Sequence, residues 1–166
     1  MENALILAGV DGSQNSLLAA GVAARMASMI GARLALIHVL DEPVLGYWGG
    51  LHNRMAEDVR EEAEKILSTI AERVQRICGM TPELFIEPGS PIETITRIAA
   101  TEPGVVMVVV GRRGLDGERH ARLLKPRTGH VPVHLAGSLS VPVMCVPPDV
   151  AASQICEAIE QLRTGA

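Results

Sequence analysis

Residues 5–13 read Leu-Ile-Leu-Ala-Gly-Val-Asp-Gly-Ser, an apolar run that ends in a turn and a polar capping side chain. Similar runs rich in Val, Ile and Leu return at residues 34–40, 84–87, 105–110 and 141–146. Between them, apolar residues recur at three- and four-residue steps, which is typical of helices. Runs without polar alternation favour strands that are covered on both faces. The sequence therefore predicts an α/β fold: an open five-stranded parallel sheet, doubly wound, with helices on both faces.

The ends of the first two helices follow from capping and stop residues. Asp11-Gly12-Ser13 precedes a helix predicted over residues 14–30, and Gly31 ends it. The longest helix is predicted over residues 53–78, with Gly79 as its stop. Charged residues surround an apolar stripe on this helix, and we interpret them as a solvated face. The stripe consists of Met55, Val59, Ile66, Ile70, Val74 and Ile77.

Two shorter helices and a tail complete the prediction. One helix begins at Ser90-Pro91 and runs to about residue 100. The next begins at Gly129 or His130 and ends near residues 137–140. After Pro147-Pro148, an extra C-terminal helix is predicted over residues 149–162. We therefore expect one domain over residues 1–148 and a helical tail over residues 149–166.

Composition excludes several classes of protein. Of the 166 residues, 48% are hydrophobic and 20% charged, which indicates a compact globular chain and not a disordered one. The apolar runs are far shorter than the roughly 20 residues that a membrane-spanning helix needs. Met1-Glu2-Asn3 lacks the basic start of a signal peptide. We expect a cytoplasmic protein with no membrane partner.

Charge and cysteine usage agree with this expectation. The formal net charge is −4, and the three aromatic residues, Tyr47, Trp48 and Phe85, cannot form a base-stacking platform, so nucleic acid is excluded as the main partner. The three cysteines, Cys78, Cys145 and Cys156, are widely spaced and form no CxxC pair. We interpret them as small apolar fillers.

The loops that follow the strands carry the residues of functional interest, because ligands of parallel sheets sit beyond the carboxyl ends of the strands. The loop after the fourth strand is the richest. Residues 112–130 contain six Lys or Arg against two acidic residues, a net charge of +4, and glycines precede, interrupt and follow the basic residues. This pattern favours an anion, and a phosphate chain fits it best. The alternative is a solvated basic loop that uses glycine only for turning.

The sequence resembles the universal stress protein family over about residues 5 to 146. Five landmarks in order carry the likeness: Val10-Asp11-Gly12-Ser13, Ile37-His38-Val39, Glu87-Pro88-Gly89-Ser90-Pro91, Val109-Val110-Gly111-Arg112-Arg113-Gly114 and Val141-Pro142-Val143-Met144-Cys145-Val146. The resemblance implies a Rossmann-like sheet of the adenine nucleotide alpha hydrolase type. It also implies a homodimer, and ATP bound through a glycine motif of the form G, two residues, G, nine residues, G, then Ser or Thr.

The glycine motif of this chain departs from the family pattern. Gly111 and Gly114 match its first pair. Gly137-Ser138 spells the expected end but lies only four residues before Pro142, too close to open the helix that the family has there. We therefore match Gly129-His130, which leaves fourteen residues where nine are expected and a histidine in place of a hydroxyl.

The resemblance also assigns roles to individual residues. Asp11 and Val39, with Val10 beside them, would face the adenine and ribose, and Val131 would offer its amide to the phosphates. Gly111, Gly114, Gly129 and His130 would border the phosphates. Arg112 would lie beside the phosphates, with Arg113 and Arg127 as auxiliary positive charge. The implied ligand is ATP, or ADP or AMP, which Mg²⁺ could accompany.

Other patterns carry weaker hypotheses. His130 and His134 are four residues apart, with His120 as a third candidate ligand, but no carboxylate or thiolate is suitably spaced, so we expect no metal site. Tyr47-Trp48 lies among glycines and suits a partner-contact loop or simple packing better than a lid over a base. The sequence shows no Walker A, GxSxG or HExxH motif, and we predict no catalytic residue.

Three functional hypotheses remain. The first is a regulatory nucleotide-binding protein of the stress response. The second is a nucleotide-free dimeric scaffold of the same fold, and the third is an ATP-hydrolysing enzyme. The enzyme would be expected to carry a Ser-Gly-Gly run after the first strand, where this chain has Asp11-Gly12-Ser13. In each case we expect the strand over residues 141–146 to lie at the sheet edge and to pair with its mate, because an open apolar edge invites association.

Overall fold

A computed structural model describes residues 3–40, 52–112 and 131–148. Its strands occur in the order that the sequence predicts, alternating with helices. They are β1 (Leu5–Gly9), β2 (Arg33–Leu40), β3 (Glu83–Pro88), β4 (Val105–Gly111) and β5 (Val143–Val146). All pair in parallel, in the order β3-β2-β1-β4-β5. The predicted doubly wound sheet is confirmed, and the winding reverses between β1 and β4.

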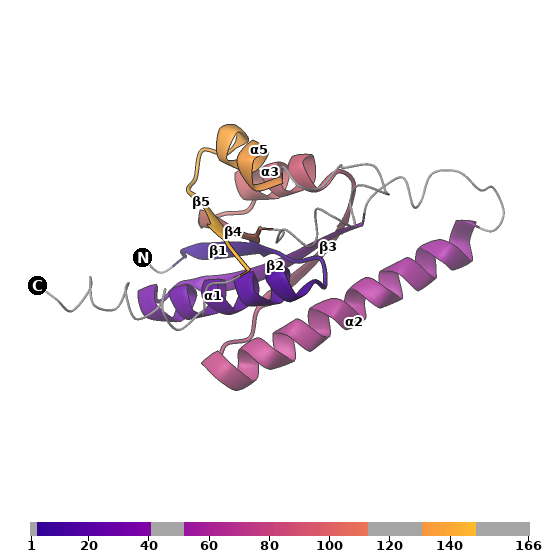
Figure 1. The fold of residues 1–166 in the computed structure, drawn as a ribbon, viewed down its shortest axis with the longest axis horizontal. Helices are drawn as coiled ribbons and strands as arrows, with labels where there is room; N and C mark the ends of the chain where they lie inside the picture. The colour runs from indigo at the N-terminus through magenta and orange to yellow at the C-terminus, as the bar shows by residue number, and fades with distance from the viewer. Residues whose placement is uncertain (1–2, 41–51, 113–130, 149–166) are drawn as a thin grey trace, which may run out of the picture.

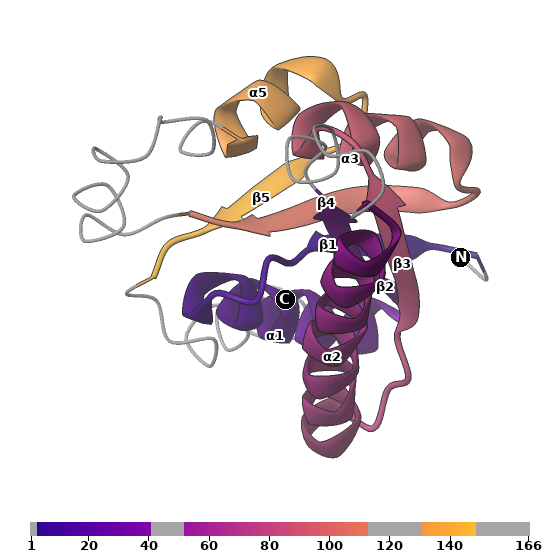
Figure 2. The ribbon, with the colours of Figure 1, turned by 90° about the vertical axis from the view of Figure 1, so that its right-hand side faces the viewer.

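The helices form a layer on each face of the sheet (Figures 1 and 2). On one face lie α1 (Gln14–Ile30) and α2 (His52–Cys78). On the other lie α3 (Pro91–Thr101) and α5 (Val131–Ser138). Two hydrophobic clusters, one under each layer, form the core. Because β1 is central, four of its five residues have no solvent exposure.

Helix α1 lies close to the sheet because its inward face consists largely of alanine, a side chain that adds little bulk. The helix begins where predicted, since the Ser13 hydroxyl oxygen accepts the amide hydrogen of Ser16 across 3.2 Å. It ends where predicted as well, because Gly31 adopts the left-handed conformation with a φ of 67°. The buried alanines of α1 are Ala19, Ala20, Ala23, Ala24 and Ala27.

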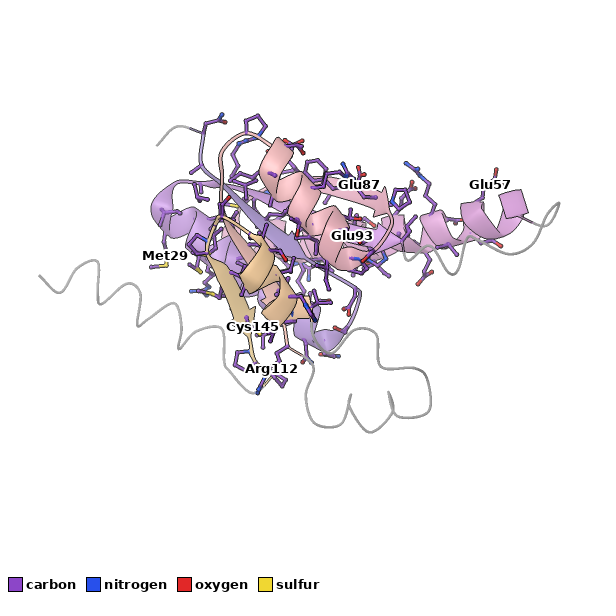
Figure 3. All side chains as sticks on the ribbon, turned by 90° about the horizontal axis from the view of Figure 1, so that it is seen from above. Met29, Glu57, Glu87, Glu93, Arg112 and Cys145 are labelled. Carbon is purple, nitrogen blue, oxygen red and sulfur yellow. The ribbon has the colours of Figure 1, made fainter. Side chains whose placement is uncertain are left out.

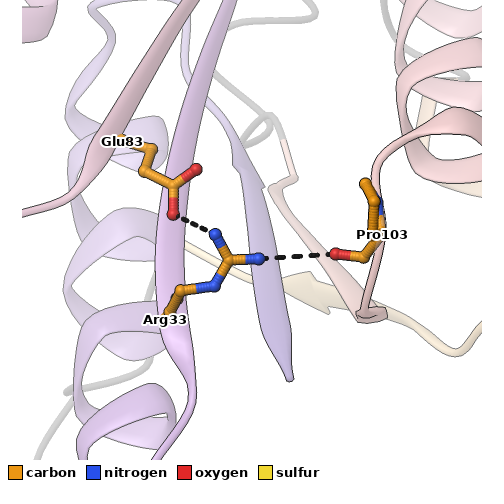
Figure 4. A network of polar contacts seen from close by, with 3 residues as sticks. All are labelled: Arg33, Glu83 and Pro103. Atoms are coloured by element: carbon orange, nitrogen blue, oxygen red, sulfur yellow. Dashed lines mark hydrogen bonds and ion pairs between the residues drawn. The ribbon is translucent and has the colours of Figure 1, made fainter. Parts of the chain in front are cut away.

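The amino ends of the strands are joined by polar contacts at the edge opposite to the loops of interest. Arg33 at the start of β2 pairs with Glu83 at the start of β3, with 2.6 Å between nitrogen and oxygen (Figure 4). The same guanidinium donates to the carbonyl oxygen of Pro103 across 3.4 Å. Both charged side chains are about 40% exposed, so we assign the pair to strand register more than to stability.

Two expectations about burial are wrong in part. Ile77, placed in the apolar stripe of α2, is 61% exposed, whereas Ala63 and Leu67 of the same helix are fully buried or nearly so. Leu84 in β3 is 47% exposed, although its strand was predicted to be covered on both faces. Leu84 is exposed because β3 is an edge strand and α2 packs mainly over β2.

The expectation that the cysteines are apolar fillers is also wrong for Cys145, which is exposed on the edge strand β5. Cys78 is half-buried against the α1–α2 cluster, and Cys156 lies outside the described residues. The predicted tail over residues 149–166 and the Tyr47-Trp48 loop lie outside them too. Within the described ranges, no helix has both the length and the apolar character needed to cross a membrane.

Candidate functional site

A pocket opens at the carboxyl ends of β1 and β4, where the winding of the sheet reverses. It encloses about 130 Å³, less than the roughly 300–1,000 Å³ of typical small-molecule sites. Its lining residues are Gly9, Val10, Asp11, Ser13, Asn15, Ser16, Ile37, Val39, Pro91, Ile95, Val110, Gly111, Val131 and Pro132.

We call the first wall the β1–β2 side, formed by Val10, Asp11 and Val39. Val10 is 5% exposed and Val39 is half-buried, so this wall is mostly apolar. Asp11 is exposed at the rim, where its Oδ1 accepts the amide hydrogen of Ser13 across 3.0 Å. That turn directs the chain from β1 into the capping residue of α1.

The backbone of Val10 is bonded to β2 through both of its polar groups. Its amide donates to the carbonyl oxygen of Ile37 across 2.9 Å. Its carbonyl oxygen lies 2.9 Å from Nδ1 of His38. The ends of β1 and β2 are thus joined along the β1–β2 side of the pocket.

The opposite wall, which we call the β4–α5 side, is formed by Gly111 and Val131, and Arg112 follows Gly111 at its edge. A Cβ on Gly111 would lie 2.7 Å from the carbonyl oxygen of Asn15 and 3.2 Å from the amide nitrogen of Ser16. The absence of a side chain at Gly111 therefore lets β4 meet the first turn of α1. This backbone contact explains by packing alone, without any ligand, why position 111 is a glycine.

Arg112 leaves β4 at the edge of this wall and is exposed. Its amide donates to the carbonyl oxygen of Val146 across 2.8 Å, which joins β4 to the end of β5. Arg112 and Cys145 are labelled near each other in Figure 3, and the charge of Arg112 acts on the Cys145 thiol. Partial burial raises the pKa of the Cys145 thiol above its ordinary value, and the positive charge of Arg112 acts in the opposite direction.

The first turn of α1 faces the pocket between the two walls. Ser16 is buried, and its hydroxyl donates to the carbonyl oxygen of Ser13 across 2.9 Å. No acidic residue stands in this turn. The partial positive charge of the helix N-terminus is thus not offset by an acidic side chain of that turn.

The structure brings together five of the predicted site residues, Val10, Asp11, Val39, Gly111 and Val131, along one pocket. Arg112 follows Gly111 directly but is not part of the lining. The remaining predicted positions lie outside the described residues, namely Arg113, Gly114, Arg127, Gly129 and His130.

Sequence reasoning assigned no site role to several lining residues. Ile37 and Val110 are apolar strand residues whose sequence looks like core, and Ile95 lies within an ordinary helical stripe. Asn15 and Ser16 belong to the first turn of α1, and the signal for them was the capping residue Ser13 just before them. These positions are recognisable only when the strand ends are seen together.

A metal site finds no support in the part of the chain that the structure describes, since no three His, Cys, Asp or Glu side chains there gather around a common point. His134 is exposed on α5, while His120 and His130 lie outside the described ranges.

The fold and the pocket define a class: a doubly wound α/β domain with a pocket at its topological switch point. Residues 4–147 match the sequence model of the Universal stress protein family. The match covers well over half of the chain, so this protein belongs to the universal stress protein family. No curated protein matches the chain.

Solved structures share the fold, among them the following three. Universal stress protein UspA from Lactobacillus plantarum has a TM-score of 0.69 and 19% identity, over 86% of this chain and 97% of its own. The universal stress protein from Archaeoglobus fulgidus, in complex with dAMP, has a TM-score of 0.63 and 20% identity, over 88% and 99%. A family protein from Arabidopsis thaliana with AMP bound has a TM-score of 0.61 and 18% identity, over 87% and 91%.

Proposed function

We propose that this chain binds an adenine nucleotide in the pocket at the switch point of its sheet. The base and ribose lie against the β1–β2 side, near Val10, Asp11 and Val39. The observation that carries the proposal is the convergence of these residues with Gly111 and Val131 on one pocket. Structural relatives that were solved with AMP and dAMP support it.

The phosphates extend along the β4–α5 side toward the segment between Arg112 and Val131. In this proposal Gly114 and Gly129 let the backbone approach the phosphates, and His130 takes the position of the family hydroxyl. Arg113 and Arg127 add positive charge, in a segment whose net charge is +4 although the whole chain carries −4. ATP, ADP and AMP are all candidate ligands, and Mg²⁺ would accompany the longer phosphate chains.

The nucleotide acts as a regulatory ligand in a cytoplasmic stress response and is not necessarily turned over. A bound ligand shifts conformation only to the extent that it prefers one state over another, so the regulated property should differ between the free and the nucleotide-bound protein. The main alternative is a nucleotide-free dimeric scaffold, and slow ATP hydrolysis is the less favoured one.

We also propose a homodimer that pairs β5 with its mate. Strand β5 is an edge of the described sheet, and its residue Cys145 is exposed. Antiparallel pairing of two such edges would satisfy both copies at once. Sedimentation of the full chain at micromolar concentration tests this, and a monomer would refute it.

Titration calorimetry of the full chain with ATP, ADP, AMP and cyclic AMP tests nucleotide binding. Native mass spectrometry of the purified protein shows in parallel whether a ligand is retained. Saturable binding of any of the four supports the proposal. If none binds and the purified protein carries no nucleotide, the scaffold is the better description.

A further inference from the structure

His38 lies on β2 with its side chain half-buried, and its Nδ1 is 2.9 Å from the carbonyl oxygen of Val10. A backbone carbonyl oxygen can only accept a hydrogen bond, so Nδ1 must carry the hydrogen. The imidazole is therefore a donor that bridges two neighbouring strands at their carboxyl ends.

This bond completes the fixation of the Val10 peptide groups. The amide of Val10 is already bonded to the carbonyl oxygen of Ile37, the residue before His38. Val10 is 5% exposed, so its carbonyl oxygen has little access to water. Without the imidazole, the carbonyl oxygen of Val10 would lose this hydrogen bond in a nearly buried position, which is unfavourable.

Asp11 follows Val10, so the position of its side chain depends on the orientation of the Val10–Asp11 peptide group. Asp11 is held on its other side by the bond from the Ser13 amide to its Oδ1, across 3.0 Å. The turn between β1 and α1 is thus held by β2 at one end and by the helix start at the other. Val10 and Asp11 both line the pocket, whereas His38 does not.

We propose that His38 is a positioning residue for adenine: acting through the Val10 carbonyl, it holds the Val10–Asp11 turn in the orientation that receives the base. The proposal rests on the nucleotide function proposed above. A residue that only filled space on β2 would be replaceable by any side chain of similar size, whereas a positioning residue requires a donor at the place of Nδ1.

Two substitutions separate these roles. His38→Asn places an amide nitrogen close to the position of Nδ1 and retains the donor, whereas His38→Leu keeps an apolar bulk and removes it. Ile70→Val is the control for a general loss of stability, because Ile70 is buried in α2 and lies outside the pocket. The affinity of each variant for AMP and for adenosine is measured by titration calorimetry.

We expect His38→Leu to weaken AMP and adenosine alike by about tenfold, the equivalent of one hydrogen bond. We expect His38→Asn to stay within about threefold of the parent chain and Ile70→Val to leave both affinities unchanged. Equal losses in the asparagine and leucine variants, or no loss in either, would overturn the positioning role.

Amide hydrogen exchange in the ligand-free protein keeps this inference separate from the nucleotide proposal. His38→Leu should accelerate exchange at the amides of Val10 and Ser13, and His38→Asn should not. If the parent chain binds none of ATP, ADP, AMP and cyclic AMP, the proposed function fails. The exchange rates then decide the positioning of the turn: faster exchange in the leucine variant alone supports it, and unchanged exchange refutes it.

Discussion

The two sides of the pocket are held in place by different means. On the β1–β2 side, both backbone polar groups of Val10 are bonded to neighbouring residues of β2: the amide donates to Ile37, and the carbonyl oxygen accepts from His38. On the β4–α5 side, Gly111 meets the backbone of Asn15 at a distance that leaves no room for a side chain. One wall is defined by bonds between strands, and the other by the absence of a single methyl group.

Because the two sides are held by different contacts, we expect a substitution on one side to leave the contacts of the other side intact. The hydrogen bonds that hold Val10 and Asp11 on the β1–β2 side lie within the described residues. The β4–α5 side joins two described ends, Arg112 and Val131, and its proposed phosphate contacts lie between them. Affinity for the base and affinity for the phosphates should therefore respond to different substitutions.

The largest effect is expected at the glycine that joins β4 to α1. Gly111→Ala would place a Cβ 2.7 Å from the carbonyl oxygen of Asn15, and we expect a loss of about 1–3 kcal/mol in the free energy of unfolding. Chemical denaturation measures it. The matched control is Gly21→Ala, where nothing lies within 4 Å of the new atom; there we expect a gain of roughly 0.5–1 kcal/mol. Equal stabilities of the two variants would contradict the close approach.

The next effect concerns the phosphate contacts. Gly114→Val and Gly129→Val should each lower the affinity for ATP by about tenfold or more, because a side chain would intrude where backbone meets phosphate. Affinity for adenosine should stay unchanged, since the β1–β2 side is untouched. Calorimetry on variants with parental denaturation curves measures both ligands. Unchanged ATP binding would remove these two glycines from the site.

A smaller effect is expected from the basic segment. Arg113→Ala and Arg127→Ala should weaken ATP binding by a few-fold, and added salt should weaken it in the parent chain, because exposed charges are screened beyond about 10 Å at 0.1 M salt. Adenosine carries no charge, and its affinity should not change with salt. An ATP affinity that is independent of salt, together with parental affinity in both variants, would show that the basic segment does not contribute to ATP binding.

The smallest effect concerns the Cys145 thiol on β5, on which the charge of Arg112 acts. Burial raises the pKa of Cys145, and the Arg112 charge opposes this rise. In Arg112→Ala the pKa should therefore rise further, and the thiolate fraction near pH 8 should fall. Alkylation of Cys145 should slow by roughly twofold, as expected for one exposed charge. Mass spectrometry of the modified peptide measures the rate, with Cys78 as the internal reference. Faster alkylation would contradict the assigned sign.

Much of the fold could be predicted because its signals are local. Strands covered by helices must be apolar, and Ser13 and Gly31 mark the ends of α1 by capping and by left-handed backbone. Burial was harder to predict where it depended on neighbours. Ile77 fits the helical period but is 61% exposed, and Leu84 fits a covered strand but stands at the sheet edge.

The candidate site was predictable where the strand ends carry landmarks of the family. Asp11 and Val39 were assigned from the resemblance to the universal stress protein family and Gly111 from its glycine motif, and the pocket contains all three. Ile37, Ile95 and Val110 were not, because an apolar residue in a strand or helix looks the same in sequence whether it faces the core or a pocket.

By itself, then, the sequence determined the alternation of strands and helices, the helix ends and the family, because each depends on residues close together in the chain. Only the tertiary structure decided which strand ends meet. It placed His38 beneath the Val10 carbonyl, set Gly111 against the first turn of α1 and left Cys145 exposed on an edge strand. Those outcomes depend on the order of strands in the sheet, a property that no single segment encodes.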